Sequence, residues 1–381
     1  MSIKVYFVLP NFSVIGAQRV AVDLGFALLR RGADVYWIAG GDGPFAKEIN
    51  PERCIYYSPL LHWIPKVRLI ESLFRLSLTV RSINDGTLVS ITPFLNRYLC
   101  LLKWVGVIRA RLVIEDHAFP PRSNVDEFPR ALVRWFYEST VWLYSSCDKL
   151  RVLSPECASY YTGKLGTDFK KAVVFENLLN LPRIVEAASL NNKLPEKQKK
   201  RIVYIGRFTT QKNIRFLIEA FNLIKGKVDA EFYIIGYGPE ESSLKKLIDY
   251  LELSDRVYII GSSAENFSIL KTADVFPIAS LWEGMVLTIA EAMLLNVPVV
   301  STDFVAGPRF YFGEGSGRIS LVEENDIEAF ASAIEFVLLN PCLAAERATL
   351  ARAFIERTMD VDSRIIDYQR LFLDDLVRGN V

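Results

Sequence analysis

The stretch VFPIASLWEGMVLTIAEAMLLNVPVVST, residues 275–302, contains two short apolar runs with a longer apolar segment between them. Residues 275–279 and 298–302 have the length and composition of buried strands, whereas residues 286–295 have the length of a helix. Asn296 tolerates the left-handed backbone conformation that commonly ends a helix, so the helix is predicted to stop there. The stretch therefore predicts a strand, a helix and a further strand.

The same alternation continues through most of the 381-residue chain. Strand-like runs of β-branched and aromatic residues occur at 3–10, 33–40, 87–92, 111–117, 149–154 and 172–177, and again at 201–207, 230–236, 256–261 and 317–322. Segments with helical periodicity lie between them, as in residues 17–31 and 214–225. Strands that alternate with helices predict parallel sheets covered on both faces, with ligand sites at the carboxyl ends of the strands.

One break in this alternation divides the chain. Residues 178–200 are polar and rich in lysine, and the length of the chain suits two domains. We predict an α/β protein with two doubly wound domains, over residues 1–180 and 201–360, joined by a linker over residues 181–200. Residues 361–381 are predicted to form a C-terminal helix, for which a return to the first domain is one option.

Composition limits the class of protein. Apolar residues make up 51% of the chain, which excludes the intrinsically disordered class. Residues 1–180 hold 22 Lys and Arg against 16 Asp and Glu, a balance of +6 that fits an acidic partner but that solvated helix faces also produce. The five cysteines have no CxxC spacing, and neither a signal-peptide pattern nor a run of 18 uncharged apolar residues occurs. We therefore expect a cytoplasmic protein that at most lies on the inner face of the membrane.

Two carboxylates interrupt the apolar stretch at 275–302. Glu283 lies in the turn before the predicted helix, and Glu291 lies within it. Ionised carboxylates in apolar surroundings need a hydrogen-bond partner, and paired sugar hydroxyls suit them. The free amides from Gly284 to Leu287, at the helix N-terminus, suit a diphosphate. The pattern favours a nucleotide-sugar site, although one Glu that interacts with the helix dipole and another on the surface fit it equally well.

Two cations follow another predicted strand, in GRFTTQKN, residues 206–213. Arg207 lies at the end of that strand, and Lys212 follows five residues later. Two cations that converge on one crevice can neutralise a departing diphosphate and replace a metal ion. A surface Arg and Lys beside a turn are the alternative interpretation.

Together these motifs resemble the retaining glycosyltransferases of family four, or glycosyl transferases group 1. The resemblance rests on EGMVLTIAE, with seven residues between Glu283 and Glu291, and on a Lys five residues after the Arg of GRF. It also rests on VPVVSTD, IIGYGPE and RVYIIG, and it is stronger over residues 201–322 than before them. The resemblance implies the GT-B fold, in which two Rossmann-like domains face each other across an interdomain cleft.

The resemblance assigns roles in the second domain. Arg207 and Lys212 would neutralise the diphosphate of the donor. Glu291 would bind the ribose, and Glu283 would contact the donor sugar. Backbone groups would border the rest of the donor, namely Gly284, Met285 and Val286 at the phosphate and sugar, and Gly236 and Ile260 at the nucleoside.

The resemblance is weaker in the first domain. Gly16 would lie against the diphosphate, and His117, which follows a predicted strand, would lie beside the reacting sugar; a structural histidine is the alternative. Three residues depart from the family's pattern. Ile15 stands where a second glycine is common, Gln18 replaces a usual Glu, and Phe310 stands where an acid is frequent.

The implied activity is transfer of a hexose or N-acetylhexosamine from a nucleotide-diphosphate sugar, such as a UDP-sugar, to a glycan or lipid-linked acceptor. The usual setting of the family is polysaccharide synthesis for the cell envelope. We expect front-side attack, because no carboxylate is clearly placed as a covalent nucleophile, and we expect no cofactor, no metal and no nucleic acid. Asp360 and Asp362 form a DVD triplet before a predicted helix, which favours helix capping over metal binding.

Other interpretations stay open. A nucleotide-sugar epimerase of the same fold would need no acceptor, and a non-catalytic partner subunit would bind nucleotide without turnover. A dinucleotide dehydrogenase is disfavoured because no GxGxxG follows a predicted strand. Residues 65–83 and 130–144 combine basic with apolar side chains. Each segment predicts either a core-facing helix or a helix that lies on an anionic membrane or holds a lipid-linked acceptor.

Overall fold

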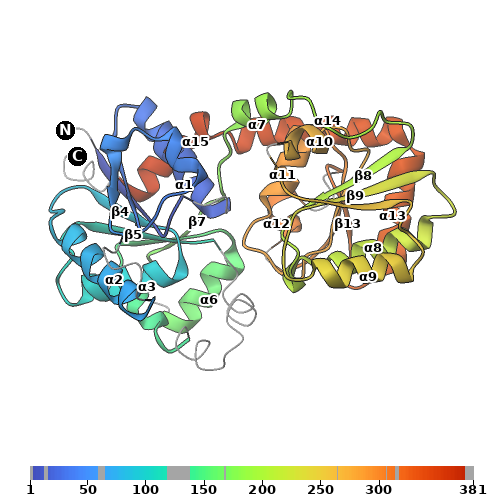
Figure 1. Cartoon of the computed structure of the whole chain (residues 1–381). Coiled ribbons are helices and arrows are strands. Elements are labelled where there is room, and N and C mark those ends of the chain that lie inside the picture. The colour runs from blue at the N-terminus through green and yellow to red at the C-terminus, as the bar shows by residue number, and fades with distance from the viewer. Residues whose placement is uncertain are drawn as a thin grey trace. The chain divides into compact units, whose positions relative to one another are not determined.

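The chain divides into two compact units, Met1–Leu179 with Val361–Val381, and Asn180–Asp360 (Figure 1). The computed structural model describes residues 3–12, 16–58, 65–117, 138–166, 169–263, 265–305, 307–313 and 317–373, without the side chains of residues 65–68.

The first unit is built on a parallel sheet with the strand order β3-β2-β1-β4-β5-β6-β7. Its strands are β1 (Lys4–Leu9), β2 (Asp34–Ala39), β3 (Cys54–Tyr56), β4 (Thr87–Ser90), β5 (Arg111–Asp116), β6 (Lys149–Val152) and β7 (Ala172–Val174). All four residues of β4 are buried, as expected for the middle of a sheet that is covered on both faces. The strand order reverses between β1 and β4, which makes their carboxyl ends the switch point where such sheets bind ligands.

Helices cover this sheet. They are α1 (Gly16–Arg30), α2 (Pro65–Arg81), α3 (Pro93–Trp104), α6 (Pro155–Leu165) and α15 (Val361–Phe372), with short 3-10 helices η1 (Pro44–Glu48), η2 (Pro51–Arg53) and η3 (Val141–Ser146). Local sequence sets where α6 begins: the Ser154 hydroxyl accepts from the amide of Cys157 at 3.2 Å, and Pro155 occupies the first helical position.

The last described helix, α15, belongs to the first unit and packs against α1. Asp362, in its first turn, accepts hydrogen bonds from Arg30 of α1 at 3.0 and 2.5 Å. Phe372 packs edge-on against Phe175, which follows β7, with 5.8 Å between ring centroids. Asp362, one of the two acids of the DVD triplet, therefore has a structural partner.

The second unit repeats the same strand order. Two ladders, β10-β9-β8 and β11-β12-β13, are joined by a parallel bridge between Ile202 and Val275, so that β8 lies beside β11. The strands are β8 (Lys200–Ile205), β9 (Ala230–Ile235), β10 (Val257–Ile260), β11 (Phe276–Ile278), β12 (Val299–Thr302) and β13 (Ser320–Val322). The strand order reverses between β8 and β11, which places a second switch point at their carboxyl ends.

The helices of the second unit begin with α7 (Leu181–Ala187), at the start of the segment predicted as a linker. The others are η4 (Thr210–Lys212), α8 (Ile214–Ile224), α9 (Glu241–Tyr250), α10 (Asn266–Leu270), α11 (Leu287–Leu294), α12 (Pro308–Phe312), α13 (Ile327–Leu339) and α14 (Pro341–Thr358). None of the described helices is by itself long and apolar enough to cross a membrane. Helices α13 and α14 pass that test only as a pair, bent by 100° at their junction.

Every strand predicted from the sequence is present, which confirms the α/β class with parallel sheets. Helix α11 occupies the predicted place between β11 and β12, and Asn296 just after it has the expected left-handed backbone, with φ 58°. Strand β3 was not predicted. It has three residues at the edge of the sheet and follows two short 3-10 helices, so it carries too little periodic signal.

Candidate active site

The second unit brings two loops together at its switch point. One loop follows β8 and contains Arg207 and Lys212; the other follows β11 and contains Glu283. The amide of Leu281 donates to the carbonyl oxygen of Gln211 at 2.8 Å, so the loops are joined through their backbones. Residues 71 positions apart in the sequence thereby share one end of the sheet.

Lys212 and Glu283 form an ion pair between these loops. The Lys212 ammonium contacts Oε1 of Glu283, and only 17% and 9% of the two side chains are exposed. Gln211 donates from Nε2 to Oε2 of Glu283 at 3.2 Å and to the carbonyl oxygen of Trp282 at 2.8 Å. Two residues singled out in the sequence therefore meet. Gln211, which was not predicted, holds the same carboxylate from the other side.

Arg207 differs from Lys212 in its environment. It is exposed, and within the described residues its side chain makes no hydrogen bond or ion pair. The next residue, Phe208, is fully buried, and its amide donates to the carbonyl oxygen of Tyr237 at 2.9 Å. The backbone beside Arg207 is thus anchored while its guanidinium stays available to an anion.

Gly236 has a packing role in this structure. A Cβ atom at this position would lie 1.9 Å from the carbonyl oxygen of Gly206, so only glycine allows the loops after β8 and β9 to approach so closely. The Gly236 amide donates to the carbonyl oxygen of Ile260, the last residue of β10, at 2.9 Å. That N–H is therefore already in use. Contact of Gly236 and Ile260 with a nucleoside stays a prediction.

Helix α11 begins at Leu287, after the loop that contains Glu283. Gly284, Met285 and Val286 are buried, and no side chain caps the N-terminus of the helix. The Tyr311 hydroxyl donates to the carbonyl oxygen of Gly284 at 2.9 Å, which fixes the backbone before the helix. Glu291 lies in the second turn of α11 and is half-buried. A helix N-terminus without an acidic first turn is suited to an anion.

Four buried hydroxyl groups at this end of the sheet have no hydrogen-bond partner within the described residues. They belong to Tyr204 on β8, Thr209 in the loop after it, Ser280 after β11 and Thr302 on β12. Buried polar groups in folded proteins are nearly always paired, with protein, water or ligand. They lie at or near the carboxyl ends of β8, β11 and β12, the same edge that carries Lys212 and Glu283, which is a suitable place for a polar ligand.

Comparison with known proteins agrees with this geometry. The family model described as glycosyl transferases group 1 matches residues 187–357. The match covers most of the second unit. A relative in Escherichia coli, UDP-Gal:alpha-D-GlcNAc-diphosphoundecaprenol alpha-1,3-galactosyltransferase, is 25% identical over 332 residues, or 84% of either chain. An uncharacterised glycosyltransferase of Haemophilus influenzae is 24% identical over 92% of this chain and 94% of its own length.

A glycosyltransferase of Methanocaldococcus jannaschii is 37% identical, over 35% of this chain and only 37% of that protein. Among solved structures, HepE of Anabaena in complex with UDP and glucose superposes with a TM-score of 0.77, over 97% of this chain and 99% of HepE, at 16% identity. At such low identity the likeness shows the fold alone, and that fold is GT-B. The cleft between the domains stays a prediction.

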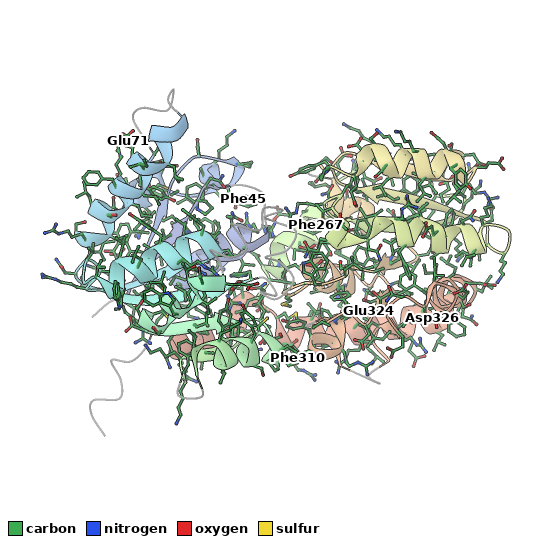
Figure 2. All side chains as sticks on the ribbon, turned by 90° about the horizontal axis from the view of Figure 1, so that it is seen from below. Phe45, Glu71, Phe267, Phe310, Glu324 and Asp326 are labelled. Atoms are coloured by element: carbon green, nitrogen blue, oxygen red, sulfur yellow. The ribbon has the colours of Figure 1, made fainter. Side chains whose placement is uncertain are left out.

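The predicted residues of the first unit also lie at the carboxyl ends of strands. Gly16 is the first residue of α1, which follows β1, whereas Ile15 lies outside the described residues. Gln18 is 2% exposed, and its Oε1 has no partner among the described residues. Phe310, in α12 of the second unit, is 46% exposed (Figure 2). The departures at Gln18 and Phe310 therefore give the protein one buried amide and one exposed ring.

His117 follows β5, and its imidazole is hydrogen-bonded to a buried carboxylate. Its Nε2 lies 2.9 Å from Oε2 of Glu115, which is 1% exposed. Burial alone would raise the pKa of the Glu115 carboxyl, but the guanidinium of Arg151 and the hydrogen bonds from His117 and Tyr368 outweigh burial and lower that pKa to about 2. The role of His117 in the reaction stays a prediction. The one signal in the sequence that could have revealed its partner is an acid inside the apolar run 111–117.

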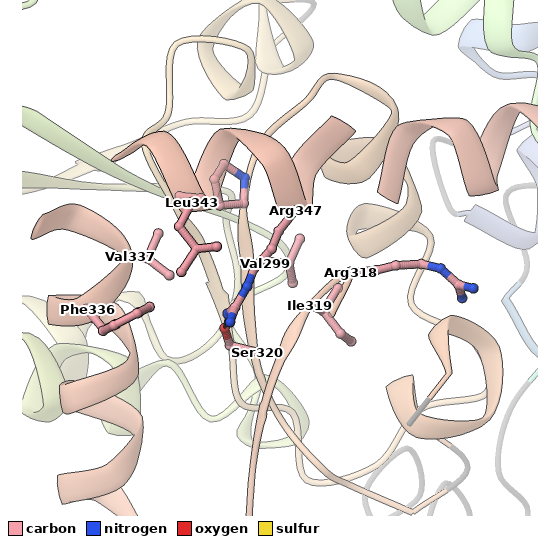
Figure 3. A pocket seen from close by; sticks show the side chains of 10 residues that line it. Val299, Arg318, Ile319, Ser320, Phe336, Val337, Leu343 and Arg347 are labelled. Carbon is pink, nitrogen blue, oxygen red and sulfur yellow. Dashed lines mark hydrogen bonds between the residues drawn. The ribbon is translucent and has the colours of Figure 1, made fainter. Parts of the chain in front are cut away.

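Two other features lie apart from this site. No group of three or more His, Cys, Asp or Glu in the described part of the chain is arranged to hold a metal ion. A small pocket is lined by side chains that include Val299, Ser320 and Phe336 (Figure 3). Val299 and Ser320 begin β12 and β13, so this pocket lies at the amino ends of these strands, opposite the edge that carries Glu283.

Proposed function

We propose that this glycosyltransferase moves a hexosyl or N-acetylhexosaminyl group from a nucleotide-diphosphate sugar to a glycan or lipid-linked acceptor, with retention of anomeric configuration. The observation that carries the proposal is the ion pair of Lys212 and Glu283 at a switch point of the sheet. Arg207, which is exposed, lies on the same loop as Lys212, and helix α11 follows Glu283 with no side-chain hydrogen bond from its N-cap residue. The E. coli relative is named for transfer of galactose to a diphosphoundecaprenol-linked sugar, and HepE was solved with UDP and glucose.

In this proposal the donor diphosphate lies against Arg207, Lys212 and the amides at the start of α11. Lys212 already contacts Glu283, so a bound donor shares or replaces that contact. The sugar of the donor would then supply hydroxyl groups to Glu283, and the ribose would supply them to Glu291. Each carboxylate and each cation thereby keeps a partner of suitable chemistry in the complex.

The proposed reaction is a front-side displacement. The acceptor hydroxyl oxygen forms a bond to the anomeric carbon on the face from which the diphosphate leaves, and the bond from that carbon to the phosphate oxygen breaks. A phosphate oxygen of the leaving nucleotide takes the proton of the acceptor hydroxyl. Negative charge grows on the diphosphate during this step, and Arg207 and Lys212 are placed to stabilise it without a metal ion.

Helix α2 offers a surface that can contact the membrane in which a lipid-linked acceptor would lie. Its side chains Leu76 and Val80 are fully buried, whereas Ile70, Phe74 and Leu78 are 71%, 62% and 51% exposed. The helix therefore has one core-facing side, as one interpretation predicted, and one exposed apolar side. We assign the exposed side to the surface of an anionic membrane, which basic residues of the same helix would also favour. The second predicted segment, residues 130–144, lies mostly outside the described residues.

A ligand panel tests the donor. UDP, GDP, ADP and their sugars are added to the protein, and thermal unfolding is followed; a ligand at 100 times its dissociation constant stabilises the folded state by about 2.7 kcal/mol. One nucleotide series should stabilise the wild type and lose most of its effect in Arg207→Ala. Arg352→Ala, an exposed arginine on α14, serves as the control. If no nucleotide stabilises the wild type, the proposal fails.

Product analysis tests the reaction class. With the stabilising nucleotide sugar and an acceptor, a new glycosidic bond with the anomeric configuration of the donor is expected. A changed sugar without a new bond would make the protein an epimerase, and binding without any product would make it a non-catalytic subunit.

Sedimentation with vesicles tests the membrane contact. The wild type should sediment with anionic vesicles at low salt, and Phe74→Asp should not. Leu350→Asp, on α14, is the matched control because that leucine is also about half exposed, at 52%. If Phe74→Asp sediments like the wild type, or if the wild type does not sediment, the assignment of α2 is wrong.

A further inference from the structure

We propose that Tyr368 on α15 and Arg151 on β6 are positioning residues for His117. Both act through the carboxylate of Glu115, which fixes the imidazole so that its Nδ1 accepts a hydrogen bond from a sugar hydroxyl. The inference rests on the proposed function, because it requires a sugar beside His117.

Three side chains converge on the Glu115 carboxylate. Arg151 donates from Nη1 to Oε2 at 2.7 Å, and His117 lies 2.9 Å from the same oxygen through Nε2. The Tyr368 hydroxyl donates to Oε1 at 2.7 Å from a position 253 residues away in the sequence. Glu115, Arg151 and Tyr368 are each at most 1% exposed, so water does not compete for these bonds.

The cation in this cluster is held in place. Arg151 also donates from Nε to the carbonyl oxygen of Phe175 at 3.2 Å, and from Nη2 to the carbonyl oxygen of Glu176 at 2.7 Å and to Oδ1 of Asn177 at 2.9 Å. A guanidinium with partners on all its nitrogens has one orientation. It therefore keeps Glu115 ionised and fixes its position.

This charge state determines where the proton of His117 lies. An ionised carboxylate only accepts hydrogen bonds, so the bond between Glu115 and His117 requires a proton on Nε2. In a neutral imidazole the other nitrogen, Nδ1, then carries a lone pair. Nδ1 is buried and has no partner within the described residues.

A purely structural role explains this arrangement poorly. Replacing a buried ion pair with apolar side chains of similar volume is often neutral or stabilising, so the pair of Glu115 and Arg151 does not explain itself by stability. A buried acceptor without a donor also costs free energy unless a ligand satisfies it. Both the buried ion pair and the unpaired acceptor are explained if the pair of Glu115 and Arg151 orients Nδ1 towards a hydroxyl group.

Helix α15 would then contribute to the reaction through Tyr368, which bonds to Glu115. Tyr368 approaches Glu115 only because α15 packs on the first unit, where its ring lies 6.1 Å from that of Phe175. Loss of its hydroxyl leaves Oε1 without the donor that restrains the carboxylate. Glu115 can then turn, and the imidazole attached to it loses its fixed direction.

Kinetics of Tyr368→Phe test the proposal. The phenyl ring keeps its packing while one hydroxyl is lost, so we expect about a tenfold fall in kcat, the scale of one hydrogen bond to a charged group, with little change in the KM for the donor. Tyr98→Phe is the control, because that hydroxyl also bonds within the first unit, to the carbonyl oxygen of Leu73 at 2.9 Å, but it lies on α3. Equal kcat in wild type and Tyr368→Phe, or equal losses in both variants, would overturn the proposal.

A second measurement does not depend on turnover. The chain has two histidines, so in a His62→Gln background the nitrogen NMR signals come from His117 alone. We expect the neutral imidazole to carry its proton on Nε2 and not on Nδ1, and a mixture of tautomers in Glu115→Gln. If the wild type shows the mixture, the positioning role is wrong even when transfer is observed. If only the expected tautomer is seen and no transfer occurs, the proposed function fails instead.

Discussion

Lys212 and Arg207 lie on the same loop, but their removal should affect stability very differently. Lys212 is 17% exposed and is paired with Glu283, which is 9% exposed. In Lys212→Met the Glu283 carboxylate would stay in its buried position with only Gln211 to bind it. Breaking a buried ion pair from one side costs about 3 to 5 kcal/mol. Because both side chains retain some contact with solvent, we expect about 3 kcal/mol, the lower end of that range.

The double variant sharpens this prediction. Lys212→Met combined with Glu283→Gln removes both charges, so its loss of stability should be smaller than the sum of the two single losses, by about 2 kcal/mol. Urea unfolding is the assay, with hydrogen exchange in β8 and α11 reporting on the second unit. Arg207→Ala, which removes an exposed side chain, should stay within about 0.5 kcal/mol of wild type. Additive losses, or a Lys212→Met variant as stable as Arg207→Ala, would refute the ion pair.

Three further outcomes follow from the same structure. Arg207→Ala should raise the barrier to glycosyl transfer by about 3 kcal/mol, roughly a hundredfold in kcat, and near wild-type turnover would contradict the proposed clamp. Chelation with EDTA should leave turnover unchanged, and a loss restored by a divalent cation would show a metal requirement. Because the pKa of Glu115 is lowered from 4.5 to about 2, the unfolded state binds a proton in this window that the folded state does not. The free energy of unfolding should therefore fall as the pH falls from about 4.5 towards 2, more steeply in wild type than in Glu115→Gln, and equal slopes in urea titrations would contradict this assignment.

Local sequence was sufficient to predict most of the fold. Long apolar strands and the helix between residues 286 and 295 carry their own periodic signal, and Asn296 marks the end of that helix through its backbone preference. Strand β3 was not predicted, because three residues at the edge of a sheet are too few to show a periodic pattern. The helix that became α15 was also predicted, but periodicity alone does not say which sheet a helix covers.

The candidate site was predictable in part for a related reason. Lys212 and Glu283 were identified because each is a charged residue close to the end of a predicted strand and because the spacing of their motifs resembles that of a known family. Gln211 stands beside Lys212 in the same loop, but the donation of its amide to Glu283 depends on a tertiary contact between loops. Tyr368 reaches Glu115 across 253 residues, and no spacing rule connects them. Buried polar clusters of this kind are assembled by the fold, so sequence patterns reveal their members only one at a time.

The contact between Lys212 and Glu283 bears on how the enzyme would treat substrate and product. A free nucleoside diphosphate would share Lys212 with Glu283 or displace it, and it has no sugar hydroxyl with which to compensate that carboxylate. An intact nucleotide sugar compensates both partners at once. Under the proposed function, the nucleotide left after transfer would compete with the restored ion pair, which would lower product inhibition and speed turnover.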